Sequence, residues 1–141
     1  MEESVRLQLE DGLSFNVDID GHKIKIDSFE EFGGKNRGPR PKSLMLVALG
    51  GCTGMDVASI MQKMKVAYDD LQVRVSGVLT ESHPKHFKKM HITYLLRGKN
   101  IDRSKVEKAV ELSQEKYCGV TYSYRQSMEI THEIIIEAVS Y

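Results

Sequence analysis

Two cysteines are the residues of this 141-residue sequence best suited to covalent chemistry. Cys52 follows two glycines in the stretch LGGCTGMDV, and Cys118 ends the stretch QEKYC. A thiol reacts as its thiolate, which a helix N-terminus or a nearby cation favours. We expect Gly50 and Gly51 to interrupt or bend a helix, and if the helix restarts there, unpaired backbone N–H groups would point at Cys52. The alternative is that these small residues only let two helices approach closely.

Other residues could assist a reactive thiol. A sulfenic acid formed at Cys52 would need a second cysteine to condense with it, and Cys118 is a plausible resolving thiol. Asp56 follows Cys52 by one helical turn on the same face, where it could orient a cation or cap the helix. The segment 30–42, EEFGGKNRGPRPK, is rich in glycine, proline and basic residues and is predicted to be a loop. Its candidate cations are Lys35, Arg37, Arg40 and Lys42.

Two cysteines are too few for a disulfide framework, which leaves three interpretations of the pair. They are inert buried thiols, a transient catalytic or sensing couple, or half of a metal site. A zinc site on Cys52 and Cys118 would need two further ligands from scattered histidines, and the pair His83 and His86 falls in a predicted turn. We therefore expect no metal and no cofactor. The segment EEFGGKNRG lacks the spacing of a phosphate-binding loop.

Composition limits the partners. The sequence has 20 basic and 20 acidic residues and a pI near 7.0, which argues against general binding of nucleic acid or anionic membranes. The N-terminal segment MEESVRLQLE is neither a signal nor a transit peptide, and we expect no apolar run that approaches the ~20 residues of a membrane span. The expectation is a cytoplasmic protein with one domain over residues 1–141, whose partners are small molecules or protein.

Hydrophobic periodicity predicts an α+β fold. Residues 4–10, 13–20 and 23–29 alternate as a three-stranded meander, and 71–81 and 88–98 form a hairpin. Residues from Pro41 to about Lys65 form a helix that is apolar nearly all round, which places it at the centre of a domain or a dimer. Residues 102–118 form an amphipathic helix, and 127–139 a last strand. The predicted order is βββ-α-ββ-α-β.

The stretches GGKNRGPRPKSLMLVALGGCTGMDVASIMQKMKV and KVEKAVELSQEKYCGV together resemble the OsmC/Ohr family, especially its OsmC-like branch. The resemblance covers nearly the whole chain and implies one OsmC-like domain with a buried central helix. It also implies an intertwined homodimer with two active sites at the interface. Such proteins reduce organic hydroperoxides to alcohols, using a peroxidatic cysteine, a resolving cysteine and a dithiol reductant such as a lipoylated protein.

By motif, the resemblance assigns the peroxidatic role to Cys52 and the resolving role, through a Cys52–Cys118 disulfide, to Cys118. The family's arginine is held by a glutamate just after the proline that opens the central helix. Here Lys42 and Ser43 follow Pro41, so Arg40 or Arg37 is proposed as the cation, with partners from the acidic pair Glu30 and Glu31. Whether the protein is an enzyme stays open. The alternative is a redox-responsive or ligand-binding dimer with little peroxidase turnover.

Overall fold

The structure is a computed structural model and describes residues 1–139. The chain forms two compact units, one from Met1 to Met45 and one from Leu46 onward. Each unit has a three-stranded sheet of its own. The predicted α+β class is therefore confirmed.

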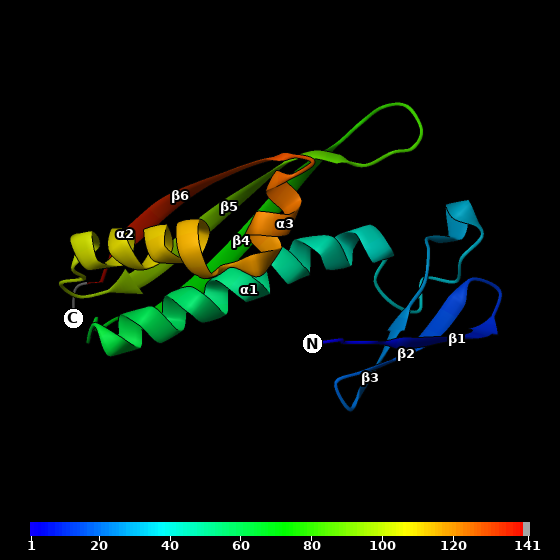
Figure 1. The fold of residues 1–141 in the computed structure, drawn as a ribbon, viewed down its shortest axis with the longest axis horizontal. Helices are drawn as coiled ribbons and strands as arrows, with labels where there is room; N and C mark the ends of the chain where they lie inside the picture. The colour runs from blue at the N-terminus through cyan, green and yellow to red at the C-terminus, as the bar shows by residue number, and fades with distance from the viewer. Residues whose placement is uncertain (140–141) are drawn as a thin grey trace. The chain divides into compact units, whose positions relative to one another are not determined.

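The first unit is an antiparallel meander of three strands (Figure 1). They are β1 (Arg6–Asp11), β2 (Ser14–Ile19) and β3 (His22–Ile26). Asp20 and Gly21 connect β2 to β3 with φ angles of 51° and 78°. Positive φ at both central residues is the requirement of the tight turn that matches the twist of paired strands. The predicted meander is confirmed.

The apolar side chains of this meander share one side of the sheet. Leu7 pairs with Val17, which pairs with Ile24, so the three form a row across the strands. Leu7 and Ile24 nevertheless keep 47% and 40% of their surface exposed. A small sheet with an apolar side this exposed needs further packing for stability.

Asp27 organises the basic loop that follows β3. Its Oδ2 accepts hydrogen bonds from the Ser14 hydroxyl at 2.5 Å and from the backbone N–H groups of Lys35 and Arg37 at 3.3 and 3.2 Å. Its Oδ1 accepts from the N–H of Ser28 at 2.7 Å. These bonds, that from Ser14 above all, lower the pKa of Asp27 to about 2. The loop, which contains one short 3₁₀ turn (η1, Glu30–Phe32), is thus tied to the meander.

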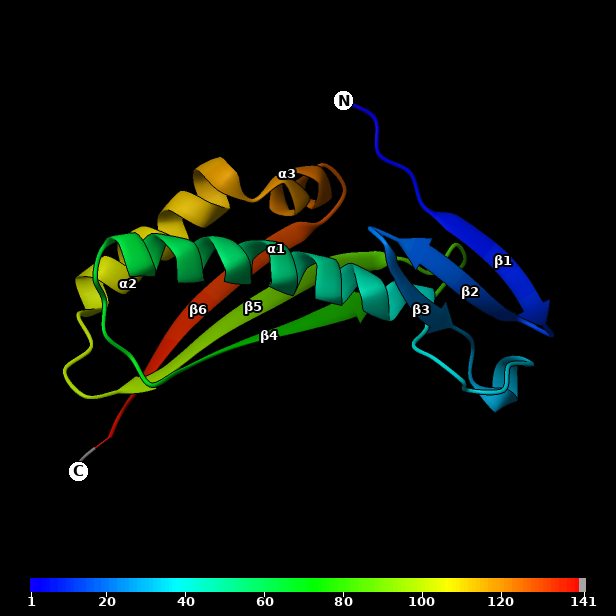
Figure 2. The ribbon, with the colours of Figure 1, turned by 90° about the horizontal axis from the view of Figure 1, so that it is seen from below.

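The second unit is a sheet with helices on one face (Figures 1 and 2). Strand β5 lies between β4, its antiparallel neighbour, and β6, its parallel neighbour. Helix α1 begins in the first unit and continues into the second. The elements are α1 (Pro41–Lys63), β4 (Asp70–Leu79), β5 (Phe87–Gly98), α2 (Arg103–Leu112), a π-helical turn η2 (Ser113–Tyr117), α3 (Gly119–Arg125) and β6 (Glu129–Ala138).

The core of this unit lies between the sheet and its helices. Every second residue of β5 between Met90 and Leu96 is fully buried: Met90, Ile92, Tyr94 and Leu96. Glycines bring α1 close to β4, because a Cβ added to Gly50 would lie only 3.0 Å from Cγ2 of Val75. This close approach holds α1 across the sheet.

The structure corrects two sequence predictions about the helices. Helix α1 runs through Gly50 and Gly51 without interruption, so the predicted break before Cys52 is wrong. Cys52 lies in mid-helix, where backbone N–H groups are already bonded within the helix. The segment 102–118, predicted as one helix, instead contains α2 followed by the π-helical turn η2. A further helix, α3, which the sequence did not predict, follows Cys118.

The expectation of no long apolar run is also wrong. Helix α1 spans 23 residues with a mean hydropathy of 1.7 in its most apolar window, which by length and composition is enough to cross a membrane. The central helix of a globular protein passes the same test. Because α1 packs on β4 and its polar side chains Thr53 and Asp56 form hydrogen bonds with Ser113 of η2, its length alone is weak evidence for a membrane span.

Candidate functional site

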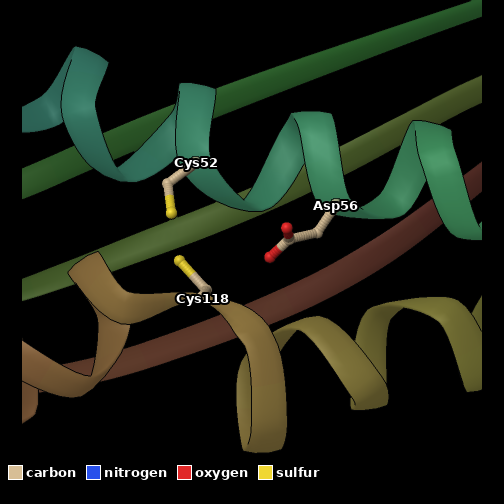
Figure 3. A group of neighbouring side chains, drawn as sticks. All are labelled: Cys52, Asp56 and Cys118. Carbon is tan, nitrogen blue, oxygen red and sulfur yellow. The ribbon is translucent and has the colours of Figure 1, made fainter.

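Cys52 and Cys118 come together in the second unit, although 65 residues separate them in the sequence. Cys52 projects from α1 toward the start of α3, where Cys118 lies, and Figure 3 shows the two sulfurs pointing at one another. Asp56 projects from the next turn of α1 into the same space. The two sulfurs and a carboxylate oxygen of Asp56 all lie within 4.8 Å of one another.

The π-helical turn η2 positions Cys118. The N–H of Cys118 donates to the carbonyl of Ser113 at 2.7 Å, a bond that closes the wide turn. Cys118 then adopts an extended conformation and begins α3, with its Sγ accepting from the N–H of Thr121 at 3.4 Å. Single π turns inside helices occur frequently at functional sites. Here the turn ends one helix and directs the thiol toward α1.

The two thiols differ in their surroundings. Cys118 is buried, whereas Cys52 is half-buried. Burial raises the pKa of Cys118, and the neighbouring Cys52 raises it further, while the hydrogen bond from Thr121 acts in the opposite direction. At neutral pH, Cys118 is therefore held as the neutral thiol.

A buried chain of hydroxyl groups runs beneath the thiols and ends at Asp56. Thr53 lies 2.6 Å from the Tyr94 hydroxyl and 2.7 Å from the Ser113 hydroxyl, and Ser113 lies 2.9 Å from Asp56 Oδ2. An ionised carboxylate can only accept, so Ser113 donates to Asp56 and must accept from Thr53. Thr53 then accepts from Tyr94. The donors are ordered from Tyr94 through Thr53 and Ser113 to Asp56.

Gln114 completes this network. Its amide group donates to the hydroxyls of Thr53 at 3.0 Å and Tyr94 at 3.1 Å, and its carbonyl accepts from Thr121 at 3.4 Å. Burial, the dominant effect, raises the pKa of Tyr94 to about 12, so this phenol keeps its proton. Across residues 1–139 every buried polar side-chain atom has a hydrogen-bond partner. The network therefore connects the residues beside both cysteines without an unpaired group.

Two cavities open at the site, one beside Cys118 and one beside Asp56, and Cys52 lines neither of them. One of about 230 Å³ is lined by Cys118, Tyr117, Tyr122 and Arg125 among others. A second of about 260 Å³ is lined by Asp56 and Tyr117 with Ser59, Ile60 and Lys63. The tyrosines next to Cys118, which in the sequence could equally be packing residues, thus form walls of open space beside it.

Arg37 and Arg40 belong to the first unit. The guanidinium of Arg37 binds Asp11 of β1, with Nη1 2.6 Å from Oδ1, and lies 3.6 Å from Glu10. Arg40 lies over the ring of Phe29, 4.3 Å from its centre. The carboxylates that hold Arg37 are thus on β1, rather than the loop pair Glu30 and Glu31. The activating role of Arg37 or Arg40 stays a prediction.

Sequence reasoning found both cysteines and Asp56 but missed the hydroxyl network. Thr53 and Tyr94 are polar residues at core-facing positions whose neighbours on the same face of α1 and β5 are apolar, which is the signal that such buried polar partners leave. Their partners Ser113 and Gln114 are distant in sequence. Only the packing of α1 against β5 and η2 reveals them.

The comparisons with known proteins agree in sequence and in fold. Residues 33–133 match the sequence profile of the family described as OsmC-like protein. Protein YhfA of Escherichia coli K12 is 31% identical over 134 residues, which cover 94% of this chain and 97% of YhfA. The crystal structure of a hypothetical protein from Aquifex aeolicus VF5 has a TM-score of 0.86 at 28% identity, covering 99% of this chain and 100% of that one.

A structure of an organic hydroperoxide resistance protein, OsmC, from Legionella pneumophila has a TM-score of 0.69 at 16% identity, with 94% of this chain and 97% of that chain covered. This likeness shows a shared fold. The matched segment of the family profile covers most of the chain and includes both cysteines. YhfA and the Aquifex aeolicus protein align with this chain over nearly their full length. The chain belongs to the OsmC-like protein family.

Proposed function

We propose that the protein is a thiol-dependent peroxidase that reduces organic hydroperoxides to alcohols. The observation that carries the proposal is the convergence of Cys52 and Cys118 from distant elements, with their sulfurs and an Asp56 oxygen within 4.8 Å. Two free thiols at this separation can form a disulfide after a small movement. Family membership supports the same chemistry.

In the proposed reaction the Cys52 thiolate attacks the distal oxygen of the hydroperoxide. An S–O bond forms, the O–O bond breaks, and the departing alkoxide takes a proton and leaves as the alcohol. The sulfenic acid on Cys52 then condenses with the thiol of Cys118, forming the disulfide and releasing water. Exchange with an external dithiol, such as a lipoylated protein, restores both thiols and leaves the reductant as its disulfide.

The surroundings of the thiols support these roles. Cys52 is the more exposed of the two, while burial raises the pKa of Cys118 and disfavours its thiolate. The cavity walled by Tyr117 and Tyr122 adjoins Cys118, whose sulfur lies within 4.8 Å of the Cys52 sulfur, so an organic peroxide would find aromatic surface near the thiol pair. We further propose Arg40 or Arg37 as the cation that favours the Cys52 thiolate.

We also propose that one domain of residues 1–141 functions as an intertwined cytoplasmic homodimer. The apolar side of the β1–β3 meander keeps large hydrophobic side chains such as Leu7 and Leu9 exposed, 47% and 49% respectively. A second copy of the chain would cover them. Homodimer formation is implied by the resemblance described above, and the exposed meander supports it.

A second function is favoured by the position of Cys52. Helix α1 is continuous, so no helix N-terminus activates this thiol, and Lys42 and Ser43 stand where a supporting carboxylate was expected. A redox-responsive or ligand-binding dimer would keep the cysteine pair without efficient turnover. It would form the Cys52–Cys118 disulfide reversibly while consuming peroxide slowly.

A peroxidase assay tests the proposal. We expect wild-type protein to consume tert-butyl hydroperoxide over many turnovers with a dithiol present, and Cys52→Ser to lose this activity. The Cys118→Ser variant should consume about one equivalent without a thiol reductant and retain a sulfenic acid that dimedone traps. Unchanged turnover in Cys52→Ser would contradict the proposal. Slow consumption with a reversible disulfide, seen by mass spectrometry, would select the redox-responsive alternative.

A further inference from the structure

We propose that Cys52, Asp56 and Cys118 bind a thiophilic divalent cation, with Zn²⁺ the best match, when both cysteines are reduced. Sequence reasoning counted only histidines as additional ligands and therefore expected no metal. The structure supplies a third donor from a carboxylate instead. The proposal needs no peroxidase activity and stands separately from it.

The spacing of the three donors is close to that of a zinc site. Zn–S bonds of about 2.3 Å and Zn–O bonds of about 2.0 Å in tetrahedral geometry place ligand atoms about 3.5 to 3.8 Å apart. The donor atoms of Cys52, Asp56 and Cys118 already lie within 4.8 Å of one another. Rotations of these side chains that close the group by about 1 Å would complete the site.

The backbone brings two elements to the cation. Cys52 and Asp56 are one turn apart on α1 and share a face, so both donors point the same way. Cys118 approaches from the opposite side, at the start of α3. The bound cation would connect α1 to the segment that η2 directs toward it.

Hydrogen bonds already orient two of the ligands. Ser113 donates to Oδ2 of Asp56, the last acceptor of the ordered hydroxyl chain, and the carboxylate has a second oxygen for the cation. The N–H of Thr121 donates to the sulfur of Cys118. Such secondary contacts fix metal ligands in place, and their loss typically weakens metal binding about 10- to 100-fold.

The donor set selects the class of cation. Two thiolates favour Zn²⁺ or Cd²⁺ over Mg²⁺ and Ca²⁺, which prefer oxygen ligands. Binding converts two thiols into two metal-bound thiolates and releases two protons to the solvent. Three protein ligands leave one position for water, as in open zinc sites.

The test is a titration of reduced wild-type protein with Co²⁺ in the absence of peroxide, followed by visible and ultraviolet absorption. We expect one Co²⁺ per chain, with a thiolate-to-cobalt charge-transfer band and the intense visible bands of tetrahedral coordination. Zn²⁺ should displace it, excess Mg²⁺ should not, and bound Zn²⁺ should protect Cys52 from iodoacetamide. Absence of the charge-transfer band, or displacement by Mg²⁺, would overturn the proposal.

Variants test the ligands Asp56 and Cys52. Competition with a chromophoric chelator should show at least about tenfold weaker Zn²⁺ binding in Asp56→Asn, and wild-type affinity in the control Asp70→Asn on β4. The Cys52→Ser variant should show a weaker charge-transfer band at the same Co²⁺ concentration, because one of the two thiolate ligands is gone, while keeping the wild-type circular dichroism spectrum. Wild-type affinity in a folded Asp56→Asn would show a dithiolate site without the carboxylate and refute the three-ligand site. If Asp56→Asn does not fold, Ser113→Ala replaces it, because Ser113 orients the Asp56 carboxylate. We expect Ser113→Ala to bind Zn²⁺ more weakly than wild type and to keep the Co²⁺ charge-transfer band. Wild-type Zn²⁺ affinity in Ser113→Ala would then count against the carboxylate as a ligand.

Discussion

At the scale of single residues, Thr53 is the centre of the site. It is fully buried in an otherwise apolar part of α1, and its hydroxyl contacts Tyr94, Ser113 and Gln114. A hydroxyl has one donor and two acceptor positions, and all three are used here. The order of donors toward Asp56 therefore depends on this one side chain.

Replacing Thr53 separates the role of its hydroxyl from that of its methyl group. Thr53→Val keeps the volume but removes the donor to Ser113 and the acceptor for Tyr94, so we expect unfolding in urea to require about 1 to 3 kcal/mol less free energy than in wild type. Thr53→Ser keeps the hydroxyl and should cost only about 0.8 kcal/mol for the lost methyl. A Val variant at least as stable as the Ser variant would contradict the proposed network.

The residue scale also shows what sequence can and cannot predict. The GGC context and the second cysteine after QEKY made Cys52 and Cys118 candidates, the family resemblance selected them as a pair, and the structure brings them together. The partners of Thr53 could not be found this way, because Tyr94 and Ser113 follow it by 41 and 60 residues. Contacts over such separations depend on how α1, β5 and η2 pack.

At the scale of elements, the strands were predictable and the helix boundaries were less so. Alternating apolar residues define β1 to β5, β6 has a continuous apolar centre at residues 134–136, and the Asp-Gly pairs mark both turns of the meander. Helix α3, in contrast, has the sequence GVTYSYR, which shows no apolar period. The continuity of α1 was missed because a helix interior tolerates glycine where close packing compensates, and Gly50 lies against Val75 of β4.

The ionised carboxylate of Asp27 holds the basic loop after β3 against the meander, and protonation of this carboxylate in acid should weaken that attachment. Bonds from Ser14 first, and from backbone N–H groups, lower the pKa of Asp27 from 3.8 to about 2. A lowered pKa in the folded state stabilises the fold at pH values above the ordinary value, and this contribution disappears as the pH falls from about 4 to about 2. We expect Asp27→Asn to be less stable at pH 7 and to show a flatter decline between these values.

Thermal unfolding followed by circular dichroism at a series of pH values measures this difference. Ser14→Ala removes the largest single cause of the shift, so its acid profile should fall between those of wild type and Asp27→Asn. Parallel profiles for wild type and Asp27→Asn over this range would show that Asp27 is not the group responsible.

At the scale of the whole molecule, the β1–β3 meander has one apolar side on which large hydrophobic side chains stay exposed. Its rows of apolar side chains, Leu7 with Val17 and Ile24, and Leu9 with Phe15 and Ile26, share one side of the sheet. Burial of apolar surface is worth about 25 cal/mol per Å², so large exposed side chains of this kind represent unused stabilisation. The sequence predicted the apolar side from its alternation, but alternation alone does not identify the surface that packs against it.

The proposed homodimer predicts that a charge on the apolar side of β1 disrupts assembly and that a charge on the other side does not. We expect light scattering coupled to gel filtration to show a dimer for wild type and mostly monomer for Leu7→Glu, because a buried unpaired carboxylate is costly. The neighbouring variant Gln8→Glu places the same charge on the opposite side of the sheet and should remain dimeric. A monomeric wild-type protein, or a dimeric Leu7→Glu, would mean that a second copy does not cover this side.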